Sequence, residues 1–394
     1  ILLTKTEEAK VLKTFSKGGV HPAENKLTAN KPIEKAGLPK QVTIPIAQHI
    51  GAPSKPVVKK KDQVKVGDVI AKSEGFVSAN IHSSVSGTIA KIDNALDPSG
   101  FRKPCVIINV EGDEWNENID TTPDLIKDFS LSAQEIRDKV SEAGIVGLGG
   151  ATFPSHVKLS VPEGKKVDTL IINGVECEPY LTSDHRVMLE RTEEMLTGIQ
   201  LLKKALGVNR VLIGIENNKP DALEHIQNIV SDKEGIEVYP LKVKYPQGGE
   251  KQLIKALINR EVPSGGLPLD VGVVVHNVGT SLAVYEAVQK NKPLVERVVT
   301  VTGKSLKKPS NFMVRIGTPV KDIIEAAGGL PEDTGKVVNG GPMMGKALNS
   351  LDIPVVKGTS GILVIPAKEA KRDKEQNCIR CAKCVSVCPM GLEP

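Results

Sequence analysis

Through about the first 120 residues, hydrophobic and polar positions alternate in short runs that glycine and proline interrupt. Examples are KVGDVIAK (65–72) and PCVIINVEG (104–112). A period of two places one face of each run in a core and the other in solvent, and the interruptions mark turns between strands. This pattern predicts an all-β unit, either a barrel or a sandwich.

From about residue 130 the pattern changes to hydrophobic runs that alternate with amphipathic helices. LSAQEIRDKVSEAG opens the change and is predicted to be helical up to Gly144, because Ser132 and Glu135 form a capping box and Leu131 and Ile136 are spaced as a hydrophobic staple. The runs VDTLIINGVE, NRVLIGIE, IEVYPLKVKY and VGVVVHNVG follow. Strands with so few polar positions are buried on both faces, which predicts a three-layer α/β domain with a mostly parallel sheet.

Ligands of such sheets bind at the carboxyl ends of the strands, which directs attention to the loops INGVECEP, KYPQGGEK and HNVGTS. Beyond them, RVVTVTGKSLKKPSNFMVRIGTPVKDIIEAAGG predicts a small unit of two strands and a helix, and the charged linker AKEAKRDKEQN leads to a cysteine run. The predicted domains are a barrel over residues 1–125, an α/β domain over 126–296, a smaller domain over 297–366, and a linker with a cysteine segment over 367–394.

Composition excludes several functional classes. The formal net charge of +5, with 25% charged residues, is a thin excess spread along the chain, and 3% aromatic residues provide few platforms for stacking bases. The longest apolar runs are far shorter than the ~20 residues of a membrane span. No secretory signal is present and the first residue is Ile1, so we expect a trimmed amino terminus.

Four of the six cysteines lie in CIRCAKCVSVCP, with the spacing C-x2-C-x2-C-x3-C-P. This is the ferredoxin run, in which three cysteines hold one [4Fe–4S] cluster and the fourth ligates a second cluster. It predicts Cys378, Cys381 and Cys384 as ligands of one cluster and Cys388 as a ligand of its companion. A zinc site would more often pair two separated C-x2-C knuckles. The isolated Cys105 is predicted to be a buried hydrophobic residue.

GIVGLGGATFPSHVKL follows the capped helix directly, and its glycines do not fit the dinucleotide pattern G-x-G-x-x-G. Clustered glycines still permit positive φ angles and let backbone N–H groups approach an anion, with Lys158 as a counter-charge. From the residues alone, the loop is either a phosphate cradle or a structural turn.

The same stretch resembles the flavin-binding loop of the NADH-oxidising, FMN-bearing subunit of respiratory Complex I, whose pattern is G-R-G-G-A-G-F-P-x-x-x-K-W. In the same order, NGVECEP resembles N-A-D-E-S-E-P, GGEKQLI resembles G-E-E-T-A-L-I, and HNVGTSL resembles N-V-E-T-L. The resemblance implies a site for FMN and NAD(H) made by Gly147, Gly149, Gly150, Ala151, Thr152, Phe153, Lys158, Asn173, Glu176, Glu178, Gly248, Glu250, Asn277 and Thr280.

The resemblance also implies roles within this set. The first glycine loop and its lysine would hold the FMN phosphate and the ribityl region, while Asn173, Glu176 and Glu178 would lie near the ring and the ribityl hydroxyls. Phe153 would stack on the adenine of the nicotinamide nucleotide.

Five positions depart from the Complex I pattern. Acidic residues are replaced by Val175, Gly249 and Gly279, a glycine by Thr152 and an arginine by Leu148. These changes bear more on how the nicotinamide nucleotide is held than on the flavin.

The flanking domains have resemblances of their own. VKVGDVIAKSEGFVSANIHSSVSGTIAKI resembles a lipoyl or biotinyl carrier domain, but Ala79 and Asn80 stand where a carrier has its modified lysine, so a docking barrel is predicted. The small unit over 298–329 resembles the soluble-ligand-binding β-grasp domain of Complex I and is predicted to be a packing module. The methionines of NGGPMMG (339–345), beside a glycine-rich turn, either touch a cofactor or fill gaps in a core, and the second is the commoner use of methionine.

Together with KGGVHPAENK (17–26), this order of domains resembles the C subunits of Rnf complexes, the ion-translocating NADH:ferredoxin oxidoreductases of bacterial membranes. The resemblance implies a peripheral subunit on the cytoplasmic side of the inner membrane that passes electrons between NADH, FMN and [4Fe–4S] clusters to the other subunits and, indirectly, to ferredoxin. In that family a second cysteine run follows the first, so we expect that this chain stops short of it and that the tail is empty or disordered.

Two other interpretations remain open at this point. One is a soluble FMN and iron–sulfur corrin reductase, which the amino-terminal position of the barrel disfavours. The other is a non-catalytic docking scaffold with a degenerate nucleotide site, which the three missing acidic residues favour.

Overall fold

The computed structural model describes residues 12–394. Its α/β domain is built on the strands β9 (Thr169–Gly174), β10 (Arg210–Glu216), β11 (Ile236–Leu241) and β12 (Val273–Asn277). Their order across the sheet is β11-β10-β9-β12, and each neighbouring pair is parallel. The parallel sheet expected from the hydrophobic runs is therefore confirmed.

Helices cover both faces of this sheet. The first face packs with α2 (Ala133–Glu142), α5 (Thr192–Leu206), α6 (Pro220–Val230) and α8 (Val278–Lys290). Leu170 and Ile172 of β9 join this cluster, whereas Ile171 between them joins the cluster of α7 (Glu250–Ile258). Successive strand side chains point to opposite faces, so the continuous hydrophobic run serves two cores and the three predicted layers are confirmed.

Helix α2 begins and ends as its sequence predicts. The Glu135 backbone N–H donates to the Ser132 hydroxyl, and the Ser132 N–H donates to the Glu135 carboxylate at 2.7 Å. The helix stops at Ala143, and Gly144 follows with a φ of +63°, a conformation that favours glycine.

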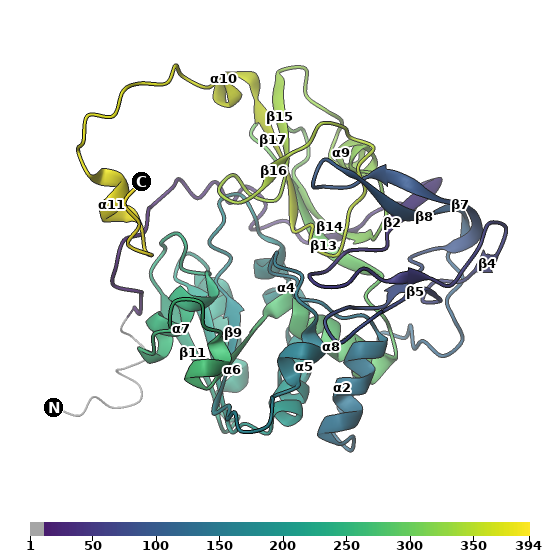
Figure 1. Ribbon diagram of the computed structural model, residues 1–394, viewed down its shortest axis with the longest axis horizontal. Helices are drawn as coiled ribbons and strands as arrows, with labels where there is room; N and C mark the ends of the chain where they lie inside the picture. The colour runs from purple at the N-terminus through teal and green to yellow at the C-terminus, as the bar shows by residue number, and fades with distance from the viewer. Residues whose placement is uncertain (1–11) are drawn as a thin grey trace.

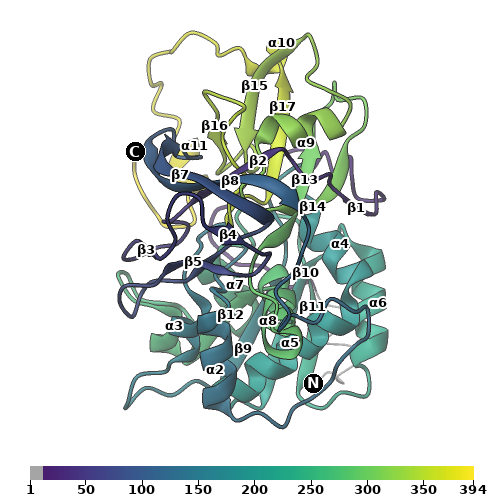
Figure 2. The ribbon, with the colours of Figure 1, turned by 90° about the vertical axis from the view of Figure 1, so that its right-hand side faces the viewer.

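The barrel consists of two antiparallel sheets. One has the order β2 (Gln41–Pro45), β8 (Arg102–Gly112), β7 (Ser86–Leu96) and β4 (Gln63–Val64), and the other has β3 (Lys55–Pro56), β5 (Val69–Lys72) and β6 (Ile81–His82). Cys105 is fully buried in it, as predicted. Figure 2 shows the barrel strands between the α/β domain below and a third unit above.

The third unit is a six-stranded sheet with the order β1 (Ile33–Lys35), β14 (Ser310–Arg315), β13 (Glu296–Thr302), β17 (Gly361–Pro366), β15 (Thr334–Asn339) and β16 (Lys346–Ala347). Helix α9 (Val320–Ala326) packs its buried residues into the core of this sheet. Its edge strand β1 comes from the segment that the sequence assigns to the barrel. Because β1 is only three residues long, it shows no alternation of hydrophobic and polar positions. Its place in the sheet of the third unit could therefore not be predicted from the sequence pattern.

Both ends of the described chain run over the surface of the α/β domain. Residues 12–31, which we term the strap, pair with it at Lys13–Leu241 and Val20–Tyr245. Residues 371–394, which we term the tail, leave α10 (Ala367–Ala370) and end in α11 (Lys383–Val387). In Figure 1 the yellow tail arcs away from α10 and α11 returns beside the purple strap. Residues 371–382 of the tail are exposed and form no helix or strand, and the expectation that the tail is empty or disordered stays a prediction.

Candidate functional site

Three loops meet at the carboxyl edge of the sheet, because β9 and β12 are neighbours and end at the same level. Asn277 pairs in register with Asn173. The Asn277 carboxamide oxygen accepts hydrogen bonds from Gly279 N and Thr280 N and so caps α8. The Asn173 carboxamide donates to the Gly248 carbonyl at 2.8 Å, which ties the loop after β11 to the loop after β9. The predicted convergence of these loops is confirmed.

The glycine loop lies beside this edge. It is closed by a hydrogen bond from Gly147 N to Phe153 O (2.9 Å) and anchored by Leu148 N, which donates to the Thr280 hydroxyl at 2.9 Å. A Cβ on Gly149 would lie 3.5 Å from the Asn277 Cβ. Thr280 thus acts by holding the loop, and its own hydroxyl is buried.

At the tip of the loop, backbone donors are open. Within the described chain, the N–H groups of Gly149, Gly150 and Ala151 make no hydrogen bond, and all three residues are exposed. Gly150 has a φ of +108°, and no atom lies within 4 Å of the position that a Cβ would take there. Open N–H groups at consecutive glycines form a concavity that suits an anion such as a phosphate.

Lys158, on the short helix α3 (Ser155–Leu159), supplies the positive charge. Its ammonium donates to the Glu250 carboxylate at 2.6 Å and to the Val275 carbonyl at 3.0 Å. Both partners are only partly buried, with the Lys158 side chain 28% exposed and that of Glu250 38% exposed. Lys158 and Glu250, both of which the resemblance assigns to the site, therefore form an ion pair.

Two predicted ring contacts are engaged elsewhere. The Glu176 carboxylate accepts hydrogen bonds from Asp184 N (2.8 Å) and His185 N (3.2 Å), so it caps α4 (Ser183–Glu190). The Glu178 carboxylate accepts from Met343 N and Met344 N. In this structure both residues shape the loop, and a direct contact with a flavin ring stays a prediction.

Burial and the neighbouring Glu176 charge raise the pKa of Asp184 to about 7. The Asn277 carboxamide donates to Asp184 at 2.6 Å, and Arg297 lies close enough to favour the charged form. Asp184, Glu176 and Asn277 therefore join the start of α4 to the loops that follow β9 and β12.

The methionine segment is not part of a core, which corrects the interpretation of NGGPMMG. Met343 is 39% exposed and Met344 is 77% exposed. A Cβ on Gly341 would lie 2.2 Å from the Glu178 carboxylate. The glycines let this turn close over Glu178, and the methionines consequently point outward.

Two lysines that the sequence analysis did not assign hold the loop after β9. Lys26 of the strap donates to the carbonyls of Glu176 (2.8 Å), Glu178 (2.9 Å) and Leu181 (2.7 Å). Lys219 donates to the Val175 carbonyl at 2.7 Å and is almost fully buried. Burial, with repulsion from Lys219, lowers the pKa of Lys26 to about 8. The only sequence signal was the motif KGGVHPAENK, which contains Lys26.

The barrel and the third unit border the same loop. Ile50 N donates to the Thr152 carbonyl at 3.3 Å, and a Cβ on Gly358 would lie 2.8 Å from the Thr152 methyl group. Phe153 itself is half-buried. Phe76, at the hairpin tip of the barrel, is 63% exposed and its ring meets the His156 ring edge-on at 6.1 Å. Phe76 is a second aromatic residue at the rim, which the sequence analysis missed.

The four tail cysteines are accessible. Cys378, Cys381 and Cys384 are exposed and Cys388 is partly buried. Leu392 N donates to the Cys388 sulfur at 3.4 Å, a contact of the kind made by backbone amides to cluster sulfurs. Across residues 12–394 no three His, Cys, Asp or Glu side chains are gathered in a way that could hold a metal ion. The role of the four tail cysteines as cluster ligands stays a prediction.

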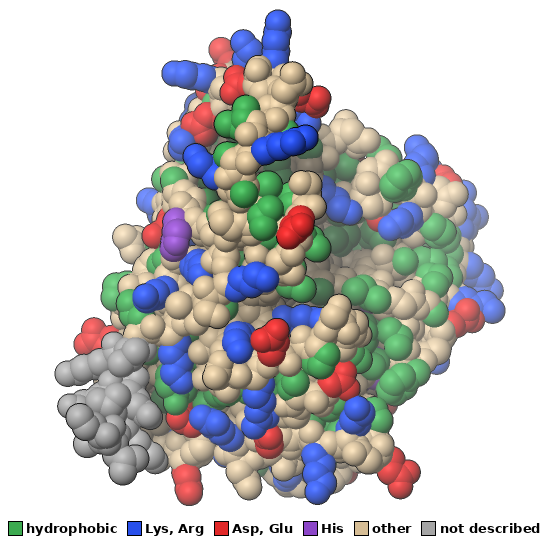
Figure 3. Space-filling view, turned by 60° about the vertical axis from the view of Figure 1, so that its left-hand side comes forward, with side chains coloured by type: hydrophobic (Ala, Val, Ile, Leu, Met, Phe, Trp, Pro, Cys, Tyr) green, Lys and Arg blue, Asp and Glu red, His purple; other side chains and the backbone are tan. Residues whose placement is uncertain are grey.

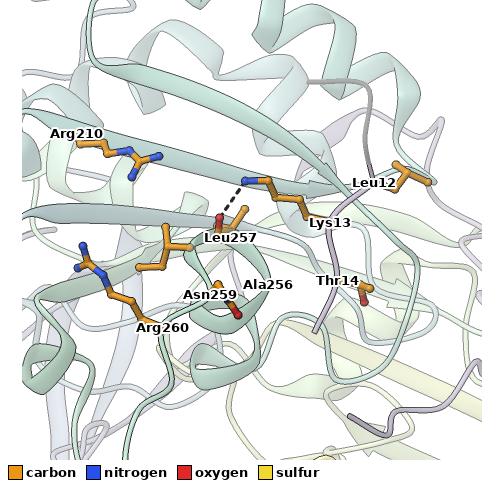
Figure 4. Close-up of a pocket in the computed structure, with 9 residues that line it drawn as sticks. Leu12, Lys13, Thr14, Arg210, Ala256, Leu257, Asn259 and Arg260 are labelled. Atoms are coloured by element: carbon orange, nitrogen blue, oxygen red, sulfur yellow. Dashed lines mark hydrogen bonds between the residues drawn. The ribbon is translucent and has the colours of Figure 1, made fainter. Parts of the chain in front are cut away.

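A cavity of 610 Å³ lies away from this site. It is lined by strap residues 12–14, by Arg210, and by residues 256–260 at the end of α7 (Figure 4). Arg210 begins β10, so the cavity is at the amino end of the strands. It does not meet the loops described above.

The donor set at the carboxyl edge fits FMN: open glycine N–H groups and the Lys158 ammonium suit its phosphate. Comparison with protein-family models also indicates an FMN-binding domain. Residues 140–286 match the Nuo51 FMN-binding domain, residues 13–113 the RnfC barrel sandwich hybrid domain, and residues 298–347 the SLBB domain. The fold and the site thus define a multidomain protein with a Nuo51-type FMN-binding domain.

Similarity to curated proteins narrows this class of multidomain protein to one family. The chain is 50% identical over 98% of its length to the C subunit of the proton-translocating ferredoxin:NAD(+) oxidoreductase complex of Clostridium ljungdahlii, and it covers 83% of that protein. It is 46% identical over 96% of its length to the C subunit of the Na(+)-translocating complex of Acetobacterium woodii, covering 85% of that relative. The chain belongs to the RnfC family, the C subunits of ion-translocating ferredoxin:NAD(+) oxidoreductase complexes.

A solved structure supports the fold. The NAD+-reducing [NiFe]-hydrogenase in its H2-reduced state matches 59% of this chain and 46% of its own chain, with a TM-score of 0.50 and 22% identity. In the described part of the chain, the helices are too short or too polar for any of them to cross a membrane.

Proposed function

We propose that this chain is the subunit that exchanges electrons with NAD(H) in an ion-translocating ferredoxin:NAD+ oxidoreductase complex. The observation that carries the proposal is the open glycine loop, which packs against Asn277 at the end of β12, while Lys158 donates to the Val275 carbonyl of the same strand. The activity for which the curated relatives are named and the FMN-binding family match support the same conclusion.

A bound flavin supplies the means to take two electrons from a nicotinamide and release them singly. The chain's own residues bind and orient it. The N–H groups of the loop tip, from Gly149 to Ala151, and the Lys158 ammonium hold the phosphate, and Lys26 and Lys219 fix the loop of Asn173 from behind. The barrel hairpin is joined to α3, which follows the loop, by a hydrogen bond of 3.0 Å between the His156 ring and the Phe76 carbonyl.

We further propose that Cys378, Cys381 and Cys384 ligate a [4Fe–4S] cluster and that Cys388 ligates a companion cluster. The subunit would then sit at the cytoplasmic side of the inner membrane, held there by other subunits of the complex. The names of the relatives support a place within such a complex.

The function is tested by reconstituting the chain with FMN and adding NADH without oxygen. We expect the flavin to bind and its visible absorbance to bleach on addition of NADH, because hydride transfer reduces the isoalloxazine. Flavin binding without bleaching would favour the scaffold with a degenerate nucleotide site, to which Val175, Gly249 and Gly279 point. Absence of both would overturn the proposal.

The cysteine assignment is tested by iron content. If the single cysteine run of this chain binds iron on anaerobic reconstitution, replacing Cys381 with serine is expected to remove most of that iron, because a cluster ligand is lost. The matched control is Cys105→Ser, since Cys105 is buried in the barrel and far from the run. Equal iron in the two variants, measured with the visible and paramagnetic spectra, would contradict the assignment.

A further inference from the structure

The segment that leads into the glycine loop is held by two cations of the third unit. Arg297, on β13, donates from its guanidinium to the Leu148 carbonyl at 3.3 Å. Lys357 donates from its ammonium to the Gly144 carbonyl at 2.7 Å. Both side chains are buried, since Arg297 is 5% exposed and Lys357 is 1% exposed. The third unit therefore binds both ends of the segment from Gly144 to Leu148.

Arg297 bonds to one end of a peptide group whose other end is an open donor. The Leu148 carbonyl and the Gly149 N–H belong to the same trans peptide, so the two groups point in opposite directions. Within residues 12–394 this N–H makes no hydrogen bond, and Gly149 is exposed. A hydrogen bond from a cation to the carbonyl also polarises the peptide and makes its N–H a stronger donor. Arg297 therefore sets both the direction and the strength of the Gly149 N–H.

The guanidinium is itself fixed by backbone carbonyls. Besides Leu148, it donates to the Lys357 carbonyl and, at 3.3 Å, to the carbonyl of the next residue, Val298. These three acceptors are neutral, so none of them cancels the positive charge. On its other side Leu148 is held by its N–H, which donates to the Thr280 hydroxyl at 2.9 Å. Both backbone polar groups of Leu148 are thus engaged, and the loop tip follows from a fixed residue.

Two departures from the Complex I pattern lie beside Arg297. Leu148 stands where the pattern has an arginine, and Gly279 where it has an acidic residue. Both line a cavity of 30 Å³ that Arg297 and Asp184 also line, and a Cβ on Gly279 would lie 3.6 Å from the Asp184 carboxylate. Burial lowers the pKa of Arg297 to about 10, and the Asp184 charge acts against that shift. A guanidinium and a carboxylate thus still face this cavity, supplied by β13 and α4.

The tip of the loop is open to solvent. Residues 149–151 are exposed, and no atom lies within 4 Å of the position that a Cβ on Gly150 would take. The face that carries the tail is hollowed, and hydrophobic and basic side chains border the hollow (Figure 3). Because the tip is exposed, an anionic ligand can reach it from solvent, while Arg297 binds the same loop from the protein interior.

We propose that Arg297 is a positioning residue for the FMN phosphate, because it holds the Leu148 carbonyl so that the Gly149 N–H points at the phosphate. This inference rests on the proposed function. It makes the third unit part of the flavin site, where the sequence predicts only a packing module. The departures at Leu148 and Gly279 then no longer favour a degenerate site, since side chains of the same charges face the same cavity.

The test compares Arg297→Lys with Arg315→Lys. Arg315, on the neighbouring strand β14, is also 5% exposed, and its partners include the Ser84 carbonyl and Asp113 of the first 125 residues. Both variants keep a positive charge and lose the planar fork that reaches several acceptors at once. Two dissociation constants are measured for each variant, one for FMN and one for riboflavin, which lacks the phosphate. The midpoint of thermal unfolding is measured beside them.

The unchanged chain should bind FMN more tightly than riboflavin. In Arg297→Lys we expect the affinity for FMN to fall about tenfold and that for riboflavin to stay, because one donor to the phosphate is misdirected. Arg315→Lys should keep the preference for FMN even where its unfolding midpoint falls. A second measurement needs no variant: in the unchanged chain, the amide resonance of Gly149 should shift when FMN binds and stay in place when riboflavin binds.

The inference is overturned if Arg297→Lys keeps the preference for FMN, if both flavins lose affinity equally, or if Arg315→Lys loses the preference as well. An unmoved Gly149 resonance overturns it even where Arg297→Lys does not fold, and so does an unchanged chain that binds the two flavins equally. A failure of the proposed function gives a different result: FMN then binds with its phosphate preference intact, but NADH does not bleach it.

Discussion

Replacing Lys158 with methionine is expected to weaken FMN binding by about 100-fold, because a charge-assisted hydrogen bond contributes on the order of 2–3 kcal/mol. Methionine keeps the length of the side chain and removes only its charge and its donors. The ammonium is held 2.6 Å from Glu250 and is partly exposed. Without it, the Glu250 carboxylate faces the phosphate uncompensated. The dissociation constant is measured by fluorescence quenching of added FMN.

The matched control for this prediction is Lys165→Met. Lys165 pairs with Asp270 at 2.9 Å on the surface and touches none of the site loops. A double variant that adds Glu250→Gln should recover part of the affinity, since it removes the unpaired carboxylate. If Lys158→Met binds FMN as tightly as Lys165→Met does, the phosphate is not held by Lys158, and the assignment built on the glycine loop is wrong.

Local signals in the sequence predicted local structure well. The capping box at Ser132 and Glu135 is made by residues three positions apart, so the start of α2 could be read directly. The runs around Ile171 and Val275 are buried on both faces and occur in a parallel sheet, as their composition indicates. Topology then brought Asn173 and Asn277 to one edge, so the edge at which the candidate loops meet could also be predicted.

The orientation of the site side chains could not be predicted, because it depends on distant partners. Glu176 points at the amino end of α4, and Glu178 at a turn 165 residues further along the chain. The exposure of Met344 follows from that same turn, whereas composition alone favoured a core. Lys26 meets its partners across 150 residues or more, so its motif could be noticed but not interpreted.

The loop after β9 depends most on Lys26, because the Lys26 ammonium binds three of its backbone carbonyls. Glu176 has a φ of +48° and Tyr180 one of +69°, so this loop contains two non-glycine residues in the left-handed region. Such conformations persist only when surrounding contacts fix them. The Lys26 ammonium spans the segment by bonding Glu176, Glu178 and Leu181, and the Tyr180 N–H donates to the Glu24 carbonyl at 2.8 Å.

Lys26→Met is therefore expected to destabilise the loop by on the order of 3 kcal/mol, since three carbonyls lose their donor at once. Amide exchange across residues 175–182 should accelerate, and FMN affinity should fall as the Asn173 loop loosens. Lys31→Met is the control, because Lys31 belongs to the same strap but is exposed, and its side chain makes no hydrogen bond or ion pair within residues 12–394. Equal exchange in the two variants would mean that the loop keeps its strained conformation without the ammonium, leaving Lys219 and the Glu176 cap to hold it.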